Sequence, residues 1–244
     1  MNNTSTSNSR CPINNVTCSL VKEFELIEKE VKQLRRLIRV DALTNYFNYR
    51  YFREALYVEM ERTRRTGLPT GLIMIDLDHF KSINDNYGHE NGNTALISAT
   101  QLWQTQIRRI DIPCRYGGEE FAIIIPGTQF AMTIRIAERL RSILGATPLA
   151  LNGQNISLTA SFGVDCFQSD EPVTLDEFVD RTDQYLLKAK RNGRNRVCYD
   201  EDRLNHYATE ISKDERMQLF NGFAEDQKKN KISTSSKSDE KTKD

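Results

Sequence analysis

The feature that most restricts the fold of this chain is an alternation of strand-like and helix-like segments between about residues 41 and 200. Apolar runs rich in β-branched residues read as strands and cover residues 71–77, 156–167 and 196–200. Segments with apolar residues at helical spacing cover 94–109, 130–144 and 175–193, the last closed by Gly193. Strands interleaved with helices predict an α+β fold, an α/β sandwich in which helices flank a mixed central sheet.

A second feature is the segment RYGGEEF at residues 115–121, which lies between the strand-like runs CRY and FAIII. It predicts a β-hairpin in which Gly117 and Gly118 supply the positive φ angles of a tight turn. Glu119 and Glu120 are not explained by the turn, because adjacent like charges repel each other. We expect a cation or a ligand to lie against them.

More carboxylates follow the strand at 71–77, where Asp76 and Asp78 fall on one face by the alternation of a strand. Alone, these residues are also typical of an ordinary turn. Together with Glu119 and Glu120 they offer hard oxygen ligands, which favour Mg²⁺, with Mn²⁺ as the alternative. Mg²⁺ is usually bound by one or two carboxylates and the phosphates of a substrate, so the pattern indicates a nucleotide.

The composition of the chain limits which partners and which cellular location we expect. Lys and Arg number 34, as do Asp and Glu, so the neutral balance argues against a general nucleic-acid binder. No apolar run approaches the roughly 18 residues of a membrane span, and residues 1–10 lack a signal-peptide core, so we expect a cytoplasmic protein. The five cysteines form no CxxC pair, which predicts reduced thiols.

The two ends of the chain differ from its centre. Residues 1–16 are rich in Asn, Ser and Thr and are expected to be disordered. Residues 17–40 carry an apolar seam of about three heptads, which predicts either a two-chain coiled-coil stalk or an amphipathic helix lying on its own domain. The seam consists of Leu20, Phe24, Ile27, Val31, Leu34 and Ile38. Residues 201–244 are expected to form a weak helix and a disordered tail.

Several motifs occur in an order that resembles the GGDEF-domain diguanylate cyclase family, with the signature in its GGEEF form. They are DALTNYFNYRYF at 41–52, DLDHFKSINDNYGHENG at 76–92, RRID at 108–111, SFGV at 161–164 and AKRNGRN at 189–195. The resemblance spans about residues 41–200 and implies a catalytic domain with a fold similar to the palm of nucleotidyl cyclases and polymerases. It implies a homodimer that condenses two GTP into cyclic di-GMP and two pyrophosphates.

The resemblance also implies roles for individual residues. Asp76, Glu119 and the backbone carbonyl of Leu77 would hold Mg²⁺, and Glu120 would be a second metal ligand or the base for the 3′-hydroxyl. The other implied nucleotide-binding residues are Phe80, Lys81, Asn84, Asn93, Gly117, Gly118, Lys190 and Arg194.

One position departs from the family pattern, because Asn93 stands where the family has Asp in G-H-x-x-G-D. A carboxylate accepts two hydrogen bonds from guanine, whereas an amide presents one acceptor and one donor group. Three outcomes remain open: a guanine cyclase with weakened selectivity, a cyclase that also uses ATP, or a poor enzyme. We favour the first, because the metal and phosphate residues are all present.

The resemblance also implies control by the product, and the length of the N-terminal segment predicts control by a partner. Arg108 and Asp111 match an RxxD inhibitory site for cyclic di-GMP, and Arg135 and Arg139 match arginines that a second domain contributes to it. The 40 residues before the catalytic block leave no room for a sensor domain, so a regulatory protein on the N-terminal helix is expected. The alternative function is a degenerate domain that only binds nucleotide or cyclic di-GMP.

Overall fold

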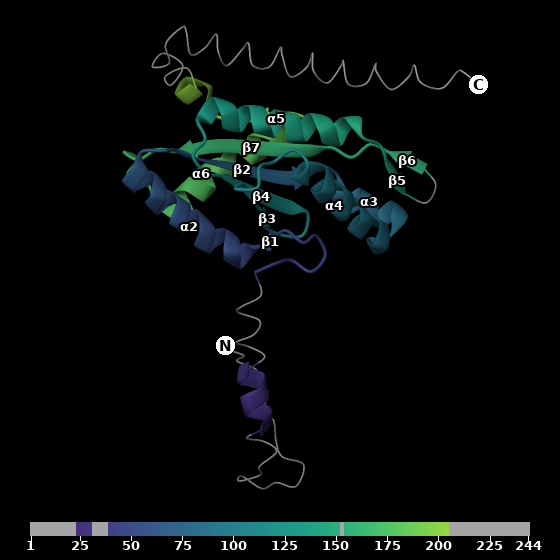
Figure 1. Ribbon diagram of the computed structural model, residues 1–244. Helices are drawn as coiled ribbons and strands as arrows, with labels where there is room; N and C mark the ends of the chain where they lie inside the picture. The colour runs from purple at the N-terminus through teal and green to yellow at the C-terminus, as the bar shows by residue number, and fades with distance from the viewer. Residues whose placement is uncertain (1–22, 31–38, 152–153, 205–244) are drawn as a thin grey trace, which may run out of the picture.

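The computed structural model describes residues 23–30, 39–151 and 154–204 (Figure 1). Six strands form the central sheet in the order β1-β3-β4-β2-β7-β8. Their bounds are β1 Phe47–Asn48, β2 Thr70–Leu77, β3 Ile112–Arg115, β4 Glu120–Ile125, β7 Ala160–Phe167 and β8 Val197–Cys198. A separate hairpin pairs β5 Leu149–Leu151 with β6 Gln154–Ile156.

The strand directions confirm the predicted mixed sheet. The central strand β2 is antiparallel to both β4 and β7, whereas β1 runs parallel to β3 and β8 runs parallel to β7. Residues Thr70 to Ile75 of β2 are all buried, as expected for a strand with neighbours on both sides and helices on both faces.

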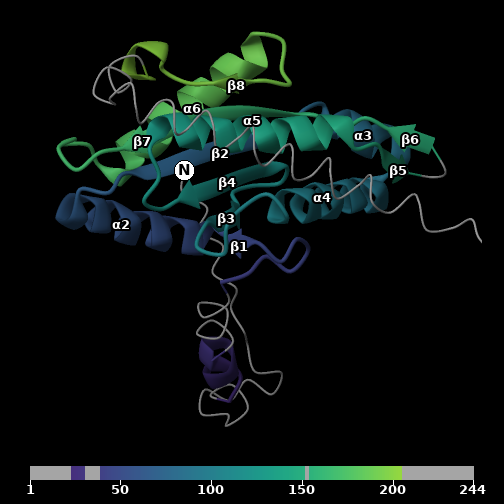
Figure 2. The same ribbon diagram turned by 45° about the horizontal axis from the view of Figure 1, so that its top comes forward.

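Helices cover the two faces of the sheet, as the alternation of β2 side chains requires. Leu72 and Met74 belong to one core with α2 Tyr49–Thr66 and α6 Leu175–Arg191. Ile73 and Ile75 belong to a second core with α4 His89–Gln104 and α5 Phe130–Ala146. Figures 1 and 2 show α5 and α2 on opposite sides of the sheet. The predicted α+β sandwich is therefore confirmed.

One close helix–sheet contact depends on a glycine of the SFGV segment. A Cβ placed on Gly163 in β7 would lie 2.3 Å from the backbone nitrogen of Leu186 and 2.4 Å from the carbonyl oxygen of Thr182. Only a residue without a side chain lets α6 lie this close to the sheet. This contact fixes where the last turn of α6 meets the ends of the strands.

Several predicted boundaries are wrong. The helix expected at 94–109 begins at His89 and ends at Gln104, because its first turns pack against the additional helix α3 Phe80–Tyr87. The strand expected at 156–167 is divided, since β6 ends at Ile156 and β7 begins at Ala160. Helix α6 ends at Arg191 with Asn192 as its C-cap, although Gly193 does adopt the positive φ of a chain reversal.

The parts of the chain outside residues 41–200 are described only in part. Residues 23–30 are helical, and Phe24 and Ile27 of the predicted seam are 51% and 50% exposed. The other seam positions, residues 1–16 and residues 205–244 lie outside the described residues, so the stalk and the tail stay predictions. Cys114, Cys166 and Cys198 are free thiols, as expected. None of the described helices is both long and apolar enough to cross a membrane.

Candidate active site

The strand register forms an acidic edge, made of Asp76, Glu119 and Glu120, where β2 ends and β4 begins. Asp76, near the end of β2, lies directly opposite Glu120, the first residue of β4. The backbone N–H of Leu77 donates to the carbonyl oxygen of Glu119 at 3.2 Å, which extends the ladder by one more residue. The strand end and the hairpin turn, which are more than 40 residues apart in the sequence, therefore meet as the sequence predicted.

Asp76 is a partly buried carboxylate with two further acidic residues close by. Burial raises the pKa of Asp76 above its usual value, Lys190 opposes that rise, and the nearby charges of Glu119 and Glu120 add to it. A cation bound beside Asp76 would stabilise the charged form of its carboxylate.

The donor set fits a hard divalent ion. Within the described residues, no group of three or more His, Cys, Asp or Glu side chains is placed to hold a metal ion. Mg²⁺ does not require one, because it is commonly bound by one or two carboxylates and completed by phosphates and water. Asp76 and Glu119, with the carbonyl of Leu77, are the groups that could hold it.

The turn itself corrects one prediction from the sequence. Gly117 and Gly118 are not among the described residues with positive φ, so they do not serve the turn in the expected way. Instead, a Cβ on Gly117 would lie 2.6 Å from Oε2 of Glu120, whereas a Cβ on Gly118 would meet nothing within 4 Å. Gly117 makes room for the carboxylate of Glu120, and Gly118 leaves the outer side of the turn open.

Sequence reasoning missed the side chain that braces this turn. The Arg115 guanidinium donates to the carbonyl oxygens of Gly117 at 3.2 Å and Gly118 at 2.8 Å. It also pairs with both carboxylate oxygens of Asp41, at 3.1 and 3.2 Å. Asp41 is held in turn by Thr44, whose N–H and Oγ1–H both donate to Oδ1. Asp41, Thr44 and Arg115 all lie within the quoted motifs, but only the fold shows that they touch.

Asp78 has a different role from Asp76, although both follow the same apolar run. Its carboxylate is buried and accepts hydrogen bonds from Thr159 Oγ1 at 2.8 Å, Ser161 Oγ at 2.7 Å and the N–H of Asn195 at 3.0 Å. Asp78 therefore ties the end of β2 to β7 and to the loop after α6. The carboxylate of Asp76 instead pairs with Lys190 and lies near the charges of Glu119 and Glu120.

Two basic residues predicted to bind phosphate lie at the end of α6. Lys190, in its last turn, forms an ion pair in which Nζ lies 2.7 Å from Oδ2 of Asp76. Arg194 lies in the following loop with φ 61° and is exposed. The structure therefore brings Lys190 directly to the acidic edge and leaves Arg194 at the surface of the neighbouring loop.

The residues predicted to contact the nucleotide from α3 and α4 lie where these helices meet. Phe80 is buried at the start of α3, and Lys81 is exposed beside it. A Cβ on Gly92 of α4 would lie only 1.8 Å from Oδ1 of Asn84, so Gly92 makes room for this amide. Asn93, the next residue, is exposed. Asn84 and Asn93 are thus presented from two adjoining helices.

The predicted inhibitory residues form a second polar cluster. The N–H of Arg108 donates to Oδ2 of Asp111 at 2.7 Å, while Oδ1 of Asp111 is buried and has no hydrogen-bond partner within the described part of the chain. Burial raises the pKa of Asp111, and the Arg108 and Arg139 charges oppose that rise. Arg139 reaches this loop from α5 of the same chain and donates to the carbonyl of Gln106 at 2.5 Å. Arg135 lies one turn earlier on α5 and is half-buried.

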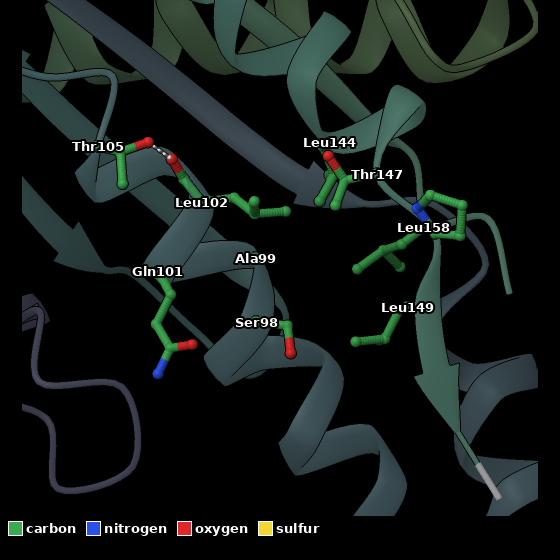
Figure 3. A pocket seen from close by; sticks show the side chains of 10 residues that line it. Ser98, Ala99, Gln101, Leu102, Thr105, Leu144, Thr147, Leu149 and Leu158 are labelled. Atoms are coloured by element: carbon green, nitrogen blue, oxygen red, sulfur yellow. Dashed lines mark hydrogen bonds between the residues drawn. The ribbon is translucent and has the colours of Figure 1, made fainter. Parts of the chain in front are cut away.

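A cavity of about 300 Å³ lies elsewhere, between α4 and the end of α5. Figure 3 shows Leu102 and Leu149 pointing into it from opposite sides, with Ser98 and Leu158 nearby. None of the carboxylates described above lines this cavity. The acidic edge therefore lies outside this cavity.

Comparisons with known proteins agree with this geometry. A family model described as "Diguanylate cyclase, GGDEF domain" matches residues 38–196. Diguanylate cyclase DosC from Escherichia coli is 34% identical over 186 residues, which are 76% of this chain and 40% of that protein. This chain spans less than half the length of the curated relatives it matches.

Two solved structures are similar to this fold. The coiled coil and GGDEF domain of DgcB from Caulobacter crescentus, in complex with c-di-GMP, matches with a TM-score of 0.64 and 27% identity, over 74% of this chain and 95% of that chain. Diguanylate cyclase SiaD from Pseudomonas aeruginosa, in complex with its activator SiaC, also matches with a TM-score of 0.64, at 30% identity over 74% of this chain and 69% of that chain.

Proposed function

Because this chain belongs to the GGDEF-domain diguanylate cyclase family, we propose that it condenses two GTP molecules into cyclic di-GMP and two pyrophosphates. The observation that carries the proposal is the register of β2 and β4, which brings Asp76 beside Glu120 and Leu77 beside Glu119. A site that only bound the product would not need this clustering of carboxylates.

In the proposed reaction, Asp76, Glu119 and the carbonyl of Leu77 would hold Mg²⁺, or Mn²⁺. The ion, when bound, supplies stabilisation of the charge that develops on the α-phosphate and activates the attacking 3′-hydroxyl. Glu120 accepts the proton of that hydroxyl or adds a further oxygen ligand. Lys190, Arg194 and Lys81 neutralise the phosphates, and Asn84 and Asn93 orient the base.

The reaction requires two such sites, because each GTP hydroxyl attacks the α-phosphate of the other GTP. We therefore propose a homodimer that works in the cytoplasm, where GTP is available. Pairing two chains through residues 17–40 would raise the effective concentration of one half-site near the other. The DgcB structure, which contains a coiled coil next to its GGDEF domain, supports this arrangement.

The test is incubation of the full chain with GTP and Mg²⁺, followed by chromatography of the products. We expect cyclic di-GMP and pyrophosphate from the wild type and no product from Glu119→Gln, with the fold of the variant unchanged by circular dichroism. A parallel sample with ATP tests whether Asn93 relaxes base selectivity. Binding of GTP without turnover would contradict the proposed activity and favour the binding-module alternative.

We also propose that cyclic di-GMP inhibits the enzyme at the cluster of Arg108, Asp111 and Arg139. The buried Oδ1 of Asp111 is free to accept a hydrogen bond from a guanine edge, and arginine forks suit guanine and phosphate oxygens. Arg108→Ala should keep its initial rate and lose product inhibition. Unchanged inhibition in that variant would exclude this site.

We propose that a regulatory protein binds the N-terminal helix. The complex of SiaD with its activator SiaC shows that a related cyclase is controlled by a second protein. Size-exclusion mass of the chain without residues 1–40 tests the stalk. An unchanged dimer would show that residues 17–40 are not what pairs the chains.

A further inference from the structure

The ion pair between Lys190 and Asp76 places an internal cation on the proposed metal ligand. Nζ of Lys190 lies 2.7 Å from Oδ2 of Asp76, and the two side chains are 29% and 13% exposed. This is a contact between residues more than 100 positions apart, made in a partly enclosed site that also holds Glu119 and Glu120. A charged pair is worth more in such a place than on an open surface.

The backbone on both sides of this pair is held in place. Asp76 is paired in the sheet with Glu120 on one side and Ser161 on the other. The loop after Lys190 is tied down, because the N–H of Arg194 donates to the carbonyl of Ala189 and the N–H of Asn195 donates to Asp78. Release of Asp76 therefore requires only rotation of the Lys190 side chain.

Lys190 has a flexible four-carbon stem and a compact charge that can exchange one oxygen partner for another. The carboxylate oxygen that it occupies is one that a divalent ion would need. A triphosphate arriving beside the acidic edge brings new oxygens for the ammonium group, which frees Asp76 at the same moment. Lys190 would thus pair with Asp76 before the nucleotide binds and with a phosphate oxygen afterwards.

We propose that Lys190 blocks Asp76 until a triphosphate draws it away, so that the divalent ion and the nucleotide bind cooperatively and the ion alone binds weakly. This inference rests on the proposed function for the location of the metal and of the phosphates. Because binding couplings are reciprocal, the ion must strengthen nucleotide binding by the same factor.

The test measures binding of Mn²⁺ alone to the full chain, by the loss of its free electron paramagnetic resonance signal. Lys190→Met removes the ammonium and keeps the apolar stem, and Lys190→Gln is a second neutral variant. We expect both to bind Mn²⁺ about tenfold or more tighter than the wild type, because a charge next to the ligand is removed. Lys190→Arg keeps the positive charge and should bind Mn²⁺ as weakly as the wild type.

Lys188 provides a matched control, since it is an exposed lysine on the same turn of α6 and forms no ion pair with Asp76 within the described part of the chain. Lys188→Met changes the net charge equally and should leave Mn²⁺ affinity at the wild-type value. Adding Asp76→Asn to Lys190→Met should abolish the gain, which assigns the bound ion to this carboxylate. Thermal unfolding confirms that each variant is folded.

A second measurement follows the coupling itself. A non-hydrolysable GTP analogue should tighten Mn²⁺ binding strongly in the wild type and much less in Lys190→Met. Equal Mn²⁺ affinity of the wild type and both neutral variants would overturn the blocking role of Lys190. Failure of the proposed cyclase activity has a different signature, namely tighter Mn²⁺ binding in Lys190→Met together with no conversion of GTP by the wild type.

Discussion

Replacement of Arg115 by Ala should impair catalysis although the side chain belongs to neither the metal ligands nor the phosphate ligands. The guanidinium donates to the carbonyls of Gly117 and Gly118 on one side and to Asp41 on the other. It is the direct link between the first residues of the catalytic block and the turn that carries Glu119. Without it, the two carbonyls and the carboxylate lose their shared donor.

The size of the effect on stability follows from the exposure of the pair. The side chains of Arg115 and Asp41 are 18% and 24% exposed, so the interaction is stronger than a surface ion pair and weaker than a buried one. Hydrogen bonds to charged groups contribute roughly 1.5–3 kcal/mol each before such screening, so we expect a loss of about 2 kcal/mol in the free energy of unfolding. For a domain of this size that corresponds to a fall in Tm of about 4–8 °C.

The substitution should lower kcat more strongly than it lowers the stability of the fold. Displacing catalytic groups by about 1 Å can lower a rate about 100-fold, and the turn carries two of the three carboxylates. We expect kcat for cyclic di-GMP formation to fall by about tenfold or more in Arg115→Ala. Arg115→Lys should recover little of this, because an ammonium cannot reach both carbonyls and Asp41 as the guanidinium fork does.

The assay combines thermal unfolding with initial rates of product formation at pH 7. At this pH Asp41 is ionised: burial acts to raise its pKa, but hydrogen bonds from Thr44 and Arg115 outweigh burial and lower it. Arg53→Ala is the control, because Arg53 pairs with Asp176 on an exposed surface and should lose well under 1 kcal/mol with kcat unchanged. A wild-type rate in Arg115→Ala, at temperatures where the variant is folded, would refute the bracing role.

Three other substitutions test separate parts of the structure. Gly163→Ala would place a Cβ 2.3 Å from the backbone of α6 and should cost about 2–3 kcal/mol in urea unfolding, whereas Gly145→Ala, which meets nothing within 4 Å, should not destabilise the fold. Asp111→Asn should be more stable than the wild type at pH 7, because burial raises the pKa of Asp111 and so disfavours its charged form. That difference should shrink as the pH falls through the raised pKa, where the wild-type carboxyl becomes protonated, and a constant difference across the pH series would contradict the assignment. Asn93→Asp restores two acceptors and should raise the ratio of kcat/KM for GTP over ATP by about tenfold, and an unchanged ratio would mean that this position does not read the base.

The sequence predicted best the helices that bury one apolar face and the strand whose apolar residues are buried along a continuous run. Strand β2 was expected at 71–77 and is found at Thr70–Leu77, and the helices expected at 130–144 and 175–193 are α5 and α6. Helix α2 was not assigned, because its 18 residues carry many charges and its caps, Asn48 and Gly67, are evident only from geometry. The early start of α4 was missed because Gly92 is a poor helix former, and its presence is explained by the amide of Asn84 packed against it.

By itself, the sequence determined the chemistry that we propose for this chain. The carboxylates at 76, 119 and 120 are recognisable from residue type and local spacing, whereas the lysine at 190 and the RxxD segment are recognisable from their resemblance to family motifs. The tertiary structure decided which of these groups meet. It paired Asp76 with Lys190 and made Asp78 a hydrogen-bond acceptor that holds neighbouring segments together. It also joined Asp41 to the turn at 117–120 through Arg115. Gly117 proved to be needed for the space beside Glu120 and not for a positive φ. The contacts of Asp76, Asp78 and Asp41 form between residues that are far apart in the sequence. Strand register and helix packing bring them together, and both depend on the packing of the whole core.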